Sequence, residues 1–232
     1  MSPKTRADGL EPHIFEKTTS AQAQISPGRY NLTIGLVLLW GLLINLLIVY
    51  EIPASSIARM GAFAFTLFFF ASSFTGVYMF NGSERPIVSF IGYNLVVIPF
   101  GMTIDVTIAR VDPEIAMEAL QITAVVTLLM MCAGSLFPRL FQKLAWTMFI
   151  SLVSAIAVEA FELLVLRTQP NLNAWFFAVI FSGYVAFDWG RANQIPKTVD
   201  NAVDSAAALY VDIVNLFLRI LEILNRLKRF KR

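Results

Sequence analysis

Long apolar runs constrain this chain more than any other feature of its sequence. A helix needs about 20 mostly apolar residues to cross the hydrocarbon core of a bilayer. Seven runs bounded by charged residues, Pro or Gly qualify as candidates. The predicted membrane-crossing helices are residues 32–50, 60–80, 87–109, 116–137, 144–166, 172–192 and 202–224.

The overall composition agrees with a membrane location. Only 15% of the residues are charged, whereas a soluble domain usually carries about a quarter. Lipid must therefore form part of the solvent of this chain. We expect an all-α, polytopic membrane protein with one seven-helix domain over residues 31–225. A polar tail (residues 1–30) should precede it and a basic tail (residues 226–232) should follow.

The last two predicted helices carry the polar residues of greatest interest. Only residues 174–187 of the sixth are cleanly apolar, so it must continue through Asp188 to reach the length of a span. Asp188 should then lie below the membrane surface. A charge at the bilayer centre costs about 3 kcal/mol or more, so the seventh helix should be central and surrounded by the other six. Its polar residues are Asp204, Asp212, Asn215, Arg219 and Glu222.

Helical spacing places four of these polar residues on one stripe. At 3.6 residues per turn, Asp212, Asn215, Arg219 and Glu222 share a face. The stripe is either a polar seam between packed helices or the lining of an ion or proton path, and spacing does not decide between them. Asp105 in the third span, and Glu159 and Glu162 in the fifth, are further candidates. Alternatively, they are solvated near an interface.

Cysteine and histidine are too scarce for several kinds of chemistry. Cys132 is the only cysteine and His13 the only histidine. A disulfide within one chain, a cysteine-based metal cluster and histidine-dependent catalysis are therefore excluded. The net charge of +2 does not favour nucleic-acid binding. We expect no tightly bound cofactor and no enzymatic activity.

The charge distribution bears on orientation. Lysine and arginine are more frequent in the N-terminal tail and the second, fourth and sixth loops than in the other three, which favours a cytoplasmic N-terminus. Seven full spans would then export the basic C-terminal tail, so the last segment either re-enters or inserts against this trend. The chain has no signal-peptide pattern, transit peptide or eukaryotic retention signal. These features favour a bacterial plasma membrane.

Two motifs near the C-terminus resemble those of a known family. The stretch AALYVDIVNLF, Ala207 to Phe217, resembles the signature of the Bax inhibitor-1 family, also called the TMBIM or lifeguard family. The stretch GYVAFD, ending at Asp188, is similar to the family's second motif, an aromatic-Asp pair at the end of the sixth helix. Gly190 stands where the family commonly has Gln. Asp200 falls where the family tends to carry an acid before the last helix.

The resemblance implies a fold and a function. The fold would have a central last helix surrounded by six others, and the function would be a pH-sensitive calcium leak controlled by Asp188 and Asp212. In relatives, an arginine near the start of the third helix latches the pair, and Arg85 is the matching candidate. Some relatives carry a glutamate in the second helix that this chain lacks. The role of that glutamate is either missing here or has moved to Asp105 or Glu159.

The chemistry of two buried carboxyl groups is consistent with that function. Two carboxylates in a low-dielectric site cannot both ionise cheaply, so they would share one proton and link the sixth and seventh helices. When that proton leaves, either the helices separate or a cation enters. Carboxylate oxygens suit Ca²⁺, so Asp188 and Asp212 could also bind this ion. The alternative is a purely structural pair, held by a helix cap, Arg191 or Arg219.

Other functions remain open. A non-conducting protein that modulates membrane-protein partners and a proton-coupled transporter both fit the sequence. An intramembrane aspartyl protease fits poorly, because Leu209, Tyr210 and Val211 stand where proteases of the presenilin type carry a glycine-rich motif. The predicted partners are the lipid bilayer, Ca²⁺, protons and other membrane proteins.

Overall fold

The computed structural model describes residues 23–162 and 173–230. Within these residues the chain is helical and contains no strand, so the predicted all-α class is confirmed. Residues 163–166 and residue 172, where the fifth span should end and the sixth begin, lie outside the described residues, as does most of the N-terminal tail. The helices are α1 (Pro27–Glu51), α2 (Ala54–Ala58), α3 (Ala62–Gly82), α4 (Pro86–Ile108), α5 (Pro113–Leu136), α6 (Pro138–Phe161), α7 (Asn173–Ala192) and α8 (Val199–Phe230).

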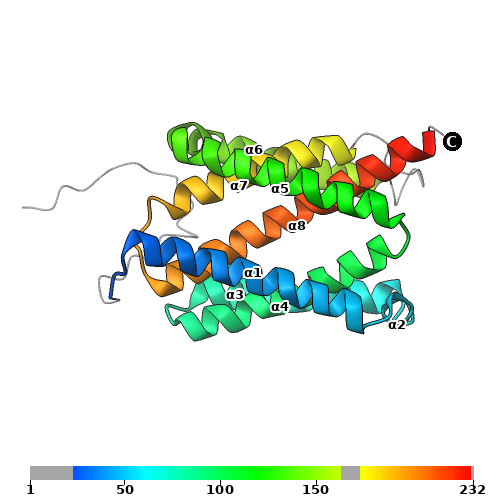
Figure 1. Cartoon of the computed structure of the whole chain (residues 1–232), viewed down its shortest axis with the longest axis horizontal. Coiled ribbons are helices and arrows are strands. Elements are labelled where there is room, and N and C mark those ends of the chain that lie inside the picture. Colours follow the sequence, from blue (N-terminus) through cyan, green and yellow to red (C-terminus); the bar gives the residue numbers. More distant parts are fainter. Residues whose placement is uncertain (1–22, 163–172, 231–232) are drawn as a thin grey trace, which may run out of the picture.

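The helices form two layers with one helix between them. α1, α3 and α4 pack together on one side, and α5, α6 and α7 on the other (Figure 1). α8 crosses diagonally between the layers and contacts α1, α4, α5 and α7. Leu209, Tyr210 and Leu221 of α8 are completely buried. The central position expected for the last helix is therefore confirmed.

Proline and loop chemistry fix where several helices begin. α1, α4, α5 and α6 each carry Pro in their first turn, where its missing N–H is not needed and its fixed φ suits a helix. The side chain of Ser26 caps α1 by accepting from the Arg29 N–H at 3.4 Å. α1 and α8 extend into the segments assigned above to the two polar tails. The short helix α2 was not predicted.

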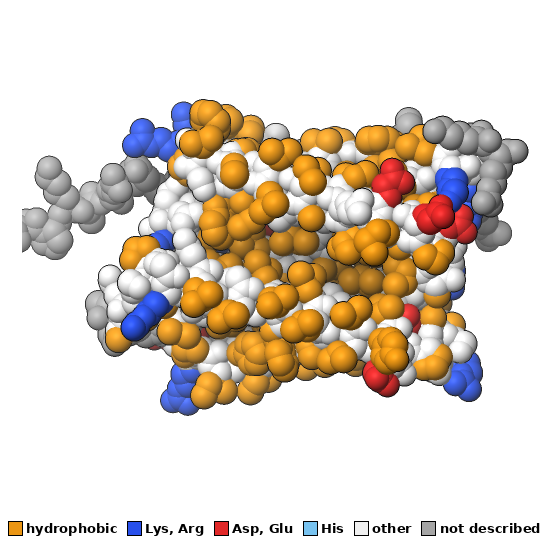
Figure 2. Space-filling model, in the orientation of Figure 1, with side chains coloured by type: hydrophobic (Ala, Val, Ile, Leu, Met, Phe, Trp, Pro, Cys, Tyr) orange, Lys and Arg blue, Asp and Glu red, His pale blue; other side chains and the backbone are white. Residues whose placement is uncertain are grey.

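Among the described residues, five helices are long and apolar enough to cross a membrane: α1, α3, α4, α5 and α6. Apolar side chains cover most of the face seen in Figure 2, whereas charged side chains gather toward the ends of the bundle. The protein is therefore an integral, multi-pass membrane protein. α7 and α8 are more polar, as the sequence indicated.

α8 runs the full length of the bundle. Its 32 residues correspond to about 48 Å at 1.5 Å per residue. It begins beside the N-terminal end of α1 and finishes at the opposite end of the bundle (Figure 1). The structure therefore shows a last helix that traverses the bundle rather than re-entering it.

Glycines allow α5 and α7 to approach closely near Asp188. A Cβ added to Gly190 of α7 would lie 2.9 Å from the carbonyl oxygen of Gly134 in α5, and a Cβ at Gly134 would collide with the Ala186 backbone. In lipid, helices lack a hydrophobic force that drives them together, so they associate through close van der Waals packing. Small residues at a crossing allow that packing because they let the two backbones approach. This contact fixes the position of α7 on both sides of Asp188.

We expect Gly134→Ala to lower stability by about 1–3 kcal/mol, because the methyl group meets backbone that cannot rotate away. The measurement is thermal unfolding of the purified protein in detergent. Gly35→Ala on α1 is the matched control, because a Cβ there meets nothing within 4 Å. A Gly134→Ala protein as stable as the control would show that the crossing tolerates a wider spacing.

Candidate functional site

The side chains of Asp188 on α7 and Asp212 on α8 lie close enough to interact directly with each other. An ionised carboxylate only accepts hydrogen bonds, so a bond between two carboxyl groups requires a proton on one of them. The structure thus brings together the two acids that the sequence singled out. The pair connects the central helix to the α5–α6–α7 layer.

The two acids have different surroundings. Asp212 is 6% exposed, and its Oδ2 atom has no hydrogen-bond partner within the described residues. Asp188 is only half-buried and lines a cavity of about 50 Å³. Asp212 is therefore the inner member of the pair, and Asp188 is the member that water or an ion in the cavity would meet first.

The cavity lies at the end of the bundle where α1 begins, between α3, α7 and α8. Its volume is sufficient for at least one water molecule. Asp204, Ala208 and Asp212 follow one another at four-residue spacing on α8, so they share a face that leads from the cavity to the pair. The cavity is lined by Phe80, Asn81, Asp188, Arg191, Ala192, Ile195, Asn201, Asp204, Ser205 and Ala208.

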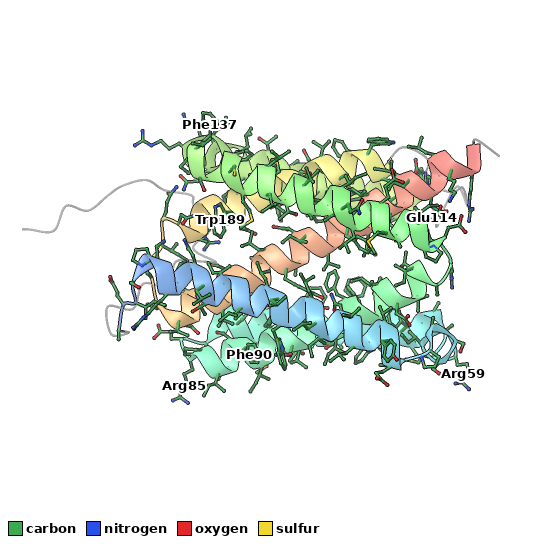
Figure 3. The ribbon with its side chains drawn as sticks, viewed as in Figure 1. Arg59, Arg85, Phe90, Glu114, Phe137 and Trp189 are labelled. Carbon is green, nitrogen blue, oxygen red and sulfur yellow. The ribbon has the colours of Figure 1, made fainter. Side chains whose placement is uncertain are left out.

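A guanidinium group that acts on the pair belongs to Arg191. This residue follows Asp188 by one turn of α7, lines the same cavity and interacts electrostatically with Asp188. Arg85, the candidate for a latch, is exposed at the start of α4 and points away from the bundle (Figure 3). The structure does not bring Arg85 to the pair. The sequence suggested Arg191 only as a residue that could hold a purely structural aspartate pair.

Tyr184 is a further neighbour that the sequence analysis missed. It precedes Asp188 by one helical turn and interacts electrostatically with both Asp188 and Asp212. The four-residue spacing was the available signal, because residues at i and i+4 of a helix are neighbours. Tyr184 therefore flanks the pair on the side away from Arg191.

Asp200 lies apart from the pair and holds the start of α8 to α4. It is 1% exposed and accepts a hydrogen bond from the Ser89 hydroxyl at 2.8 Å. It also stands in the first turn of α8, where the helix dipole favours a negative charge. The Tyr30 hydroxyl is 3.0 Å from the Ser205 hydroxyl, which ties α1 to the next turn of α8.

Replacing Ser89 by alanine should destabilise the protein by about 1–3 kcal/mol, because a buried carboxylate oxygen loses its donor. Thermal unfolding in detergent would measure this loss. Thr75→Ala is the control, since that exposed hydroxyl bonds only to the Ala71 carbonyl of its own helix. Equal stability of the two variants would mean that other contacts hold Asp200 in place.

Arg219 and Glu159 meet at the opposite end of the bundle. The guanidinium of Arg219 on α8 makes two hydrogen bonds of 3.1 Å to Glu159 on α6. It also contacts Glu222 at 3.1 Å and lies 4.1 Å from the centre of the Phe177 ring. The structure therefore assigns these members of the polar stripe to an ion-pair cluster that joins α6, α7 and α8.

Asn215 and Asp105 were the other two candidate residues. The amide of Asn215 donates to the Val211 carbonyl at 2.8 Å and is satisfied within α8. Asp105 on α4 is 4% exposed, and its Oδ2 atom has no hydrogen-bond partner among the described residues. The structure does not bring Asp105 to Asp188 or Asp212.

The donor set limits how tightly a metal ion could be held. The described residues contain no group of three His, Cys, Asp or Glu side chains placed to bind a metal. Ca²⁺ takes six to eight oxygen ligands, so two carboxylates alone would not retain it. Water and the amide or hydroxyl oxygens of the cavity would have to complete its shell.

The comparisons with known proteins give one match. The model of a family described as inhibitor of apoptosis-promoting Bax1 matches residues 30–229, which include every described helix except the ends of α1 and α8. No curated protein and no solved structure matches this chain.

Proposed function

Because the chain belongs to the Bax inhibitor-1 family, we propose that it is a cation leak whose conductance is set by protonation of Asp188 and Asp212. Ca²⁺ is the proposed permeant ion, and the protein has no resident cofactor. The membrane of residence in this proposal is a bacterial plasma membrane. The observation that supports the proposal most directly is the interacting pair of carboxyl groups beside a cavity at one end of the bundle.

The proposed closed state is the one in which the pair shares a proton. The hydrogen bond between Asp188 and Asp212 then holds α7 against α8. When pH rises and the shared proton leaves, two negative charges face each other. Their repulsion amounts to about 4 kcal/mol at 4 Å and an effective dielectric constant near 20. That is more than one neutral hydrogen bond contributes, so the pair either separates or admits a cation.

A divalent cation is the natural occupant of the ionised pair. It neutralises both carboxylates, and carboxylate oxygen is a preferred ligand of Ca²⁺. Asp204 and Asp188 on the cavity wall would meet the ion before it reaches Asp212, while Arg191 opposes accumulation of cations there. The proposed conductance is therefore a slow leak.

Transport in a purified system separates this proposal from its alternatives. The test is Ca²⁺ entry into vesicles that contain only lipid and the purified protein. A non-conducting modulator of membrane-protein partners would give no flux above protein-free vesicles. A proton-coupled transporter would move protons only when its substrate is present. Vesicles that stay Ca²⁺-tight at every pH would overturn the leak proposal.

The surroundings of Asp212 do not favour an intramembrane aspartyl protease. Leu209 and Tyr210, which precede it on α8, are completely buried. A substrate backbone could approach Asp212 only if these side chains left the core. The proposal therefore includes no enzymatic activity.

A further inference from the structure

A large apolar groove lies between α6 and the C-terminal half of α8. Its volume is about 700 Å³, and its walls come from α5, α6, α7 and α8. The lining residues include Val126, Met148, Val179, Ile223 and Leu227. The hydroxyl of Ser182, one of the few polar groups there, already donates to the Ala178 carbonyl at 2.7 Å. Water entering this groove would find few partners.

The groove exists because few residues of α6 are buried against the other helices. Ala155 is the one residue of α6 that is buried among those described. α6 packs mainly on α7 and has few contacts with α5. The bidentate Arg219–Glu159 pair bridges α6 and α8 at one end of the gap. An apolar occupant would supply the packing that these helices lack.

Charge at one end of the groove identifies the kind of occupant. Leu227 lines the groove, and the residues that follow it are Lys228, Arg229, Phe230, Lys231 and Arg232. Lys228 is paired with Asp112 and Glu114, whereas Arg229 is exposed and has no ion pair within the described residues. The C-terminal end of α8 thus places basic side chains beside an apolar groove. This groove lies within the bilayer because α5 and α6, which line it, are long and apolar enough to cross the membrane.

We propose that this groove binds one anionic phospholipid, with an acyl chain between α6 and α8 and its phosphate at the basic C-terminal end of α8. The two parts of the molecule match the two parts of the site. Bilayer lipid reaches the groove laterally, and basic residues near a membrane surface attract anionic headgroups. The bound chain would fill the gap beside the Arg219–Glu159 pair and hold α6 in place. This proposal does not depend on whether the protein conducts ions.

The test is native mass spectrometry of the purified full-length protein with dioleoyl phosphatidylglycerol or dioleoyl phosphatidylcholine. We expect one phosphatidylglycerol to stay bound under conditions that strip phosphatidylcholine. Val179→Trp, which fills the groove from α7, should abolish that retention. Arg229→Gln should weaken it about fivefold, which corresponds to ~1 kcal/mol per basic residue.

Two further variants keep the result unambiguous. Val153→Trp changes an exposed residue of α6 outside the groove and should retain phosphatidylglycerol like the wild type. Ser151→Trp fills the groove from the opposite wall and replaces Val179→Trp if that variant is not monodisperse. Equal retention of the two lipids would overturn the proposal, and so would loss of retention in Val153→Trp. Full retention in a monodisperse groove-filled variant would also overturn it.

Discussion

Asp212→Asn is expected to remove the pH dependence of Ca²⁺ flux in reconstituted vesicles. In the wild type, flux should rise about tenfold between about pH 6 and pH 8, a change equivalent to ~1.4 kcal/mol in the barrier. Asparagine keeps a hydrogen bond to Asp188 but has no proton to lose. The variant should therefore stay at the low, acidic-pH flux of the wild type. The measurement is a Ca²⁺ indicator trapped inside the vesicles.

The sign follows from the geometry of the pair. The hydrogen bond between Asp188 and Asp212 exists only while one of the two holds a proton. Acidic conditions therefore favour the closed pair, and alkaline conditions favour repulsion and opening. Asp188→Asn should behave like Asp212→Asn, because either substitution leaves a single ionisable group. Alanine at either position should instead remove the link between α7 and α8 and raise flux at acidic pH.

An exposed acid elsewhere provides the control for this experiment. Glu118→Gln removes a carboxylate from the exposed face of α5 and should leave the pH profile of flux unchanged. A pH-dependent flux that persists in both Asp188→Asn and Asp212→Asn would contradict the role of the pair. A profile that flattens in Glu118→Gln would attribute the effect to general surface charge.

The sequence predicted most of the fold because membrane helices leave a local signal. Each of the first five spans is a long and mostly apolar run, and prolines mark several of the starts. The central position of α8 was also predictable, since Asp212 and Arg219 cannot face lipid. Boundaries were less accurate at α6, which begins at Pro138. The charged side chains of Arg139 and Lys143 interrupt the apolar run there, although the helix continues through them.

The surroundings of the pair were harder to predict because they depend on non-local packing. Family resemblance suggested Arg85, yet a residue at the start of α4 reaches the pair only if its side chain points inward. The structure instead places Arg191 at the cavity, one turn from Asp188. The contact between Ser89 and Asp200 joins residues 111 positions apart. No periodicity within one helix predicts such a partner.

The Arg219–Glu159 ion pair gives the second large expected effect. Glu159→Gln should destabilise the protein by ~2 kcal/mol in thermal unfolding, because it leaves the Arg219 guanidinium short of a carboxylate away from bulk water. Breaking a fully buried pair costs about 3–5 kcal/mol. The smaller figure reflects the side chains of Arg219 and Glu159, which are 23% and 28% exposed, and the remaining contact of Arg219 with Glu222.

The double variant Glu159→Leu/Arg219→Met tests whether these two residues form a structural seam between packed helices or line a path for ions. Replacing both partners of a buried pair by apolar residues is often neutral or stabilising, so this protein should recover the stability that Glu159→Gln loses. Thermal unfolding of Glu159→Leu, Arg219→Met and the double variant completes the cycle and measures the coupling. A seam predicts that the double variant keeps a pH-dependent Ca²⁺ flux, because Asp188 and Asp212 are untouched. Recovered stability with flux abolished would instead place Arg219 and Glu159 in the path of the ion.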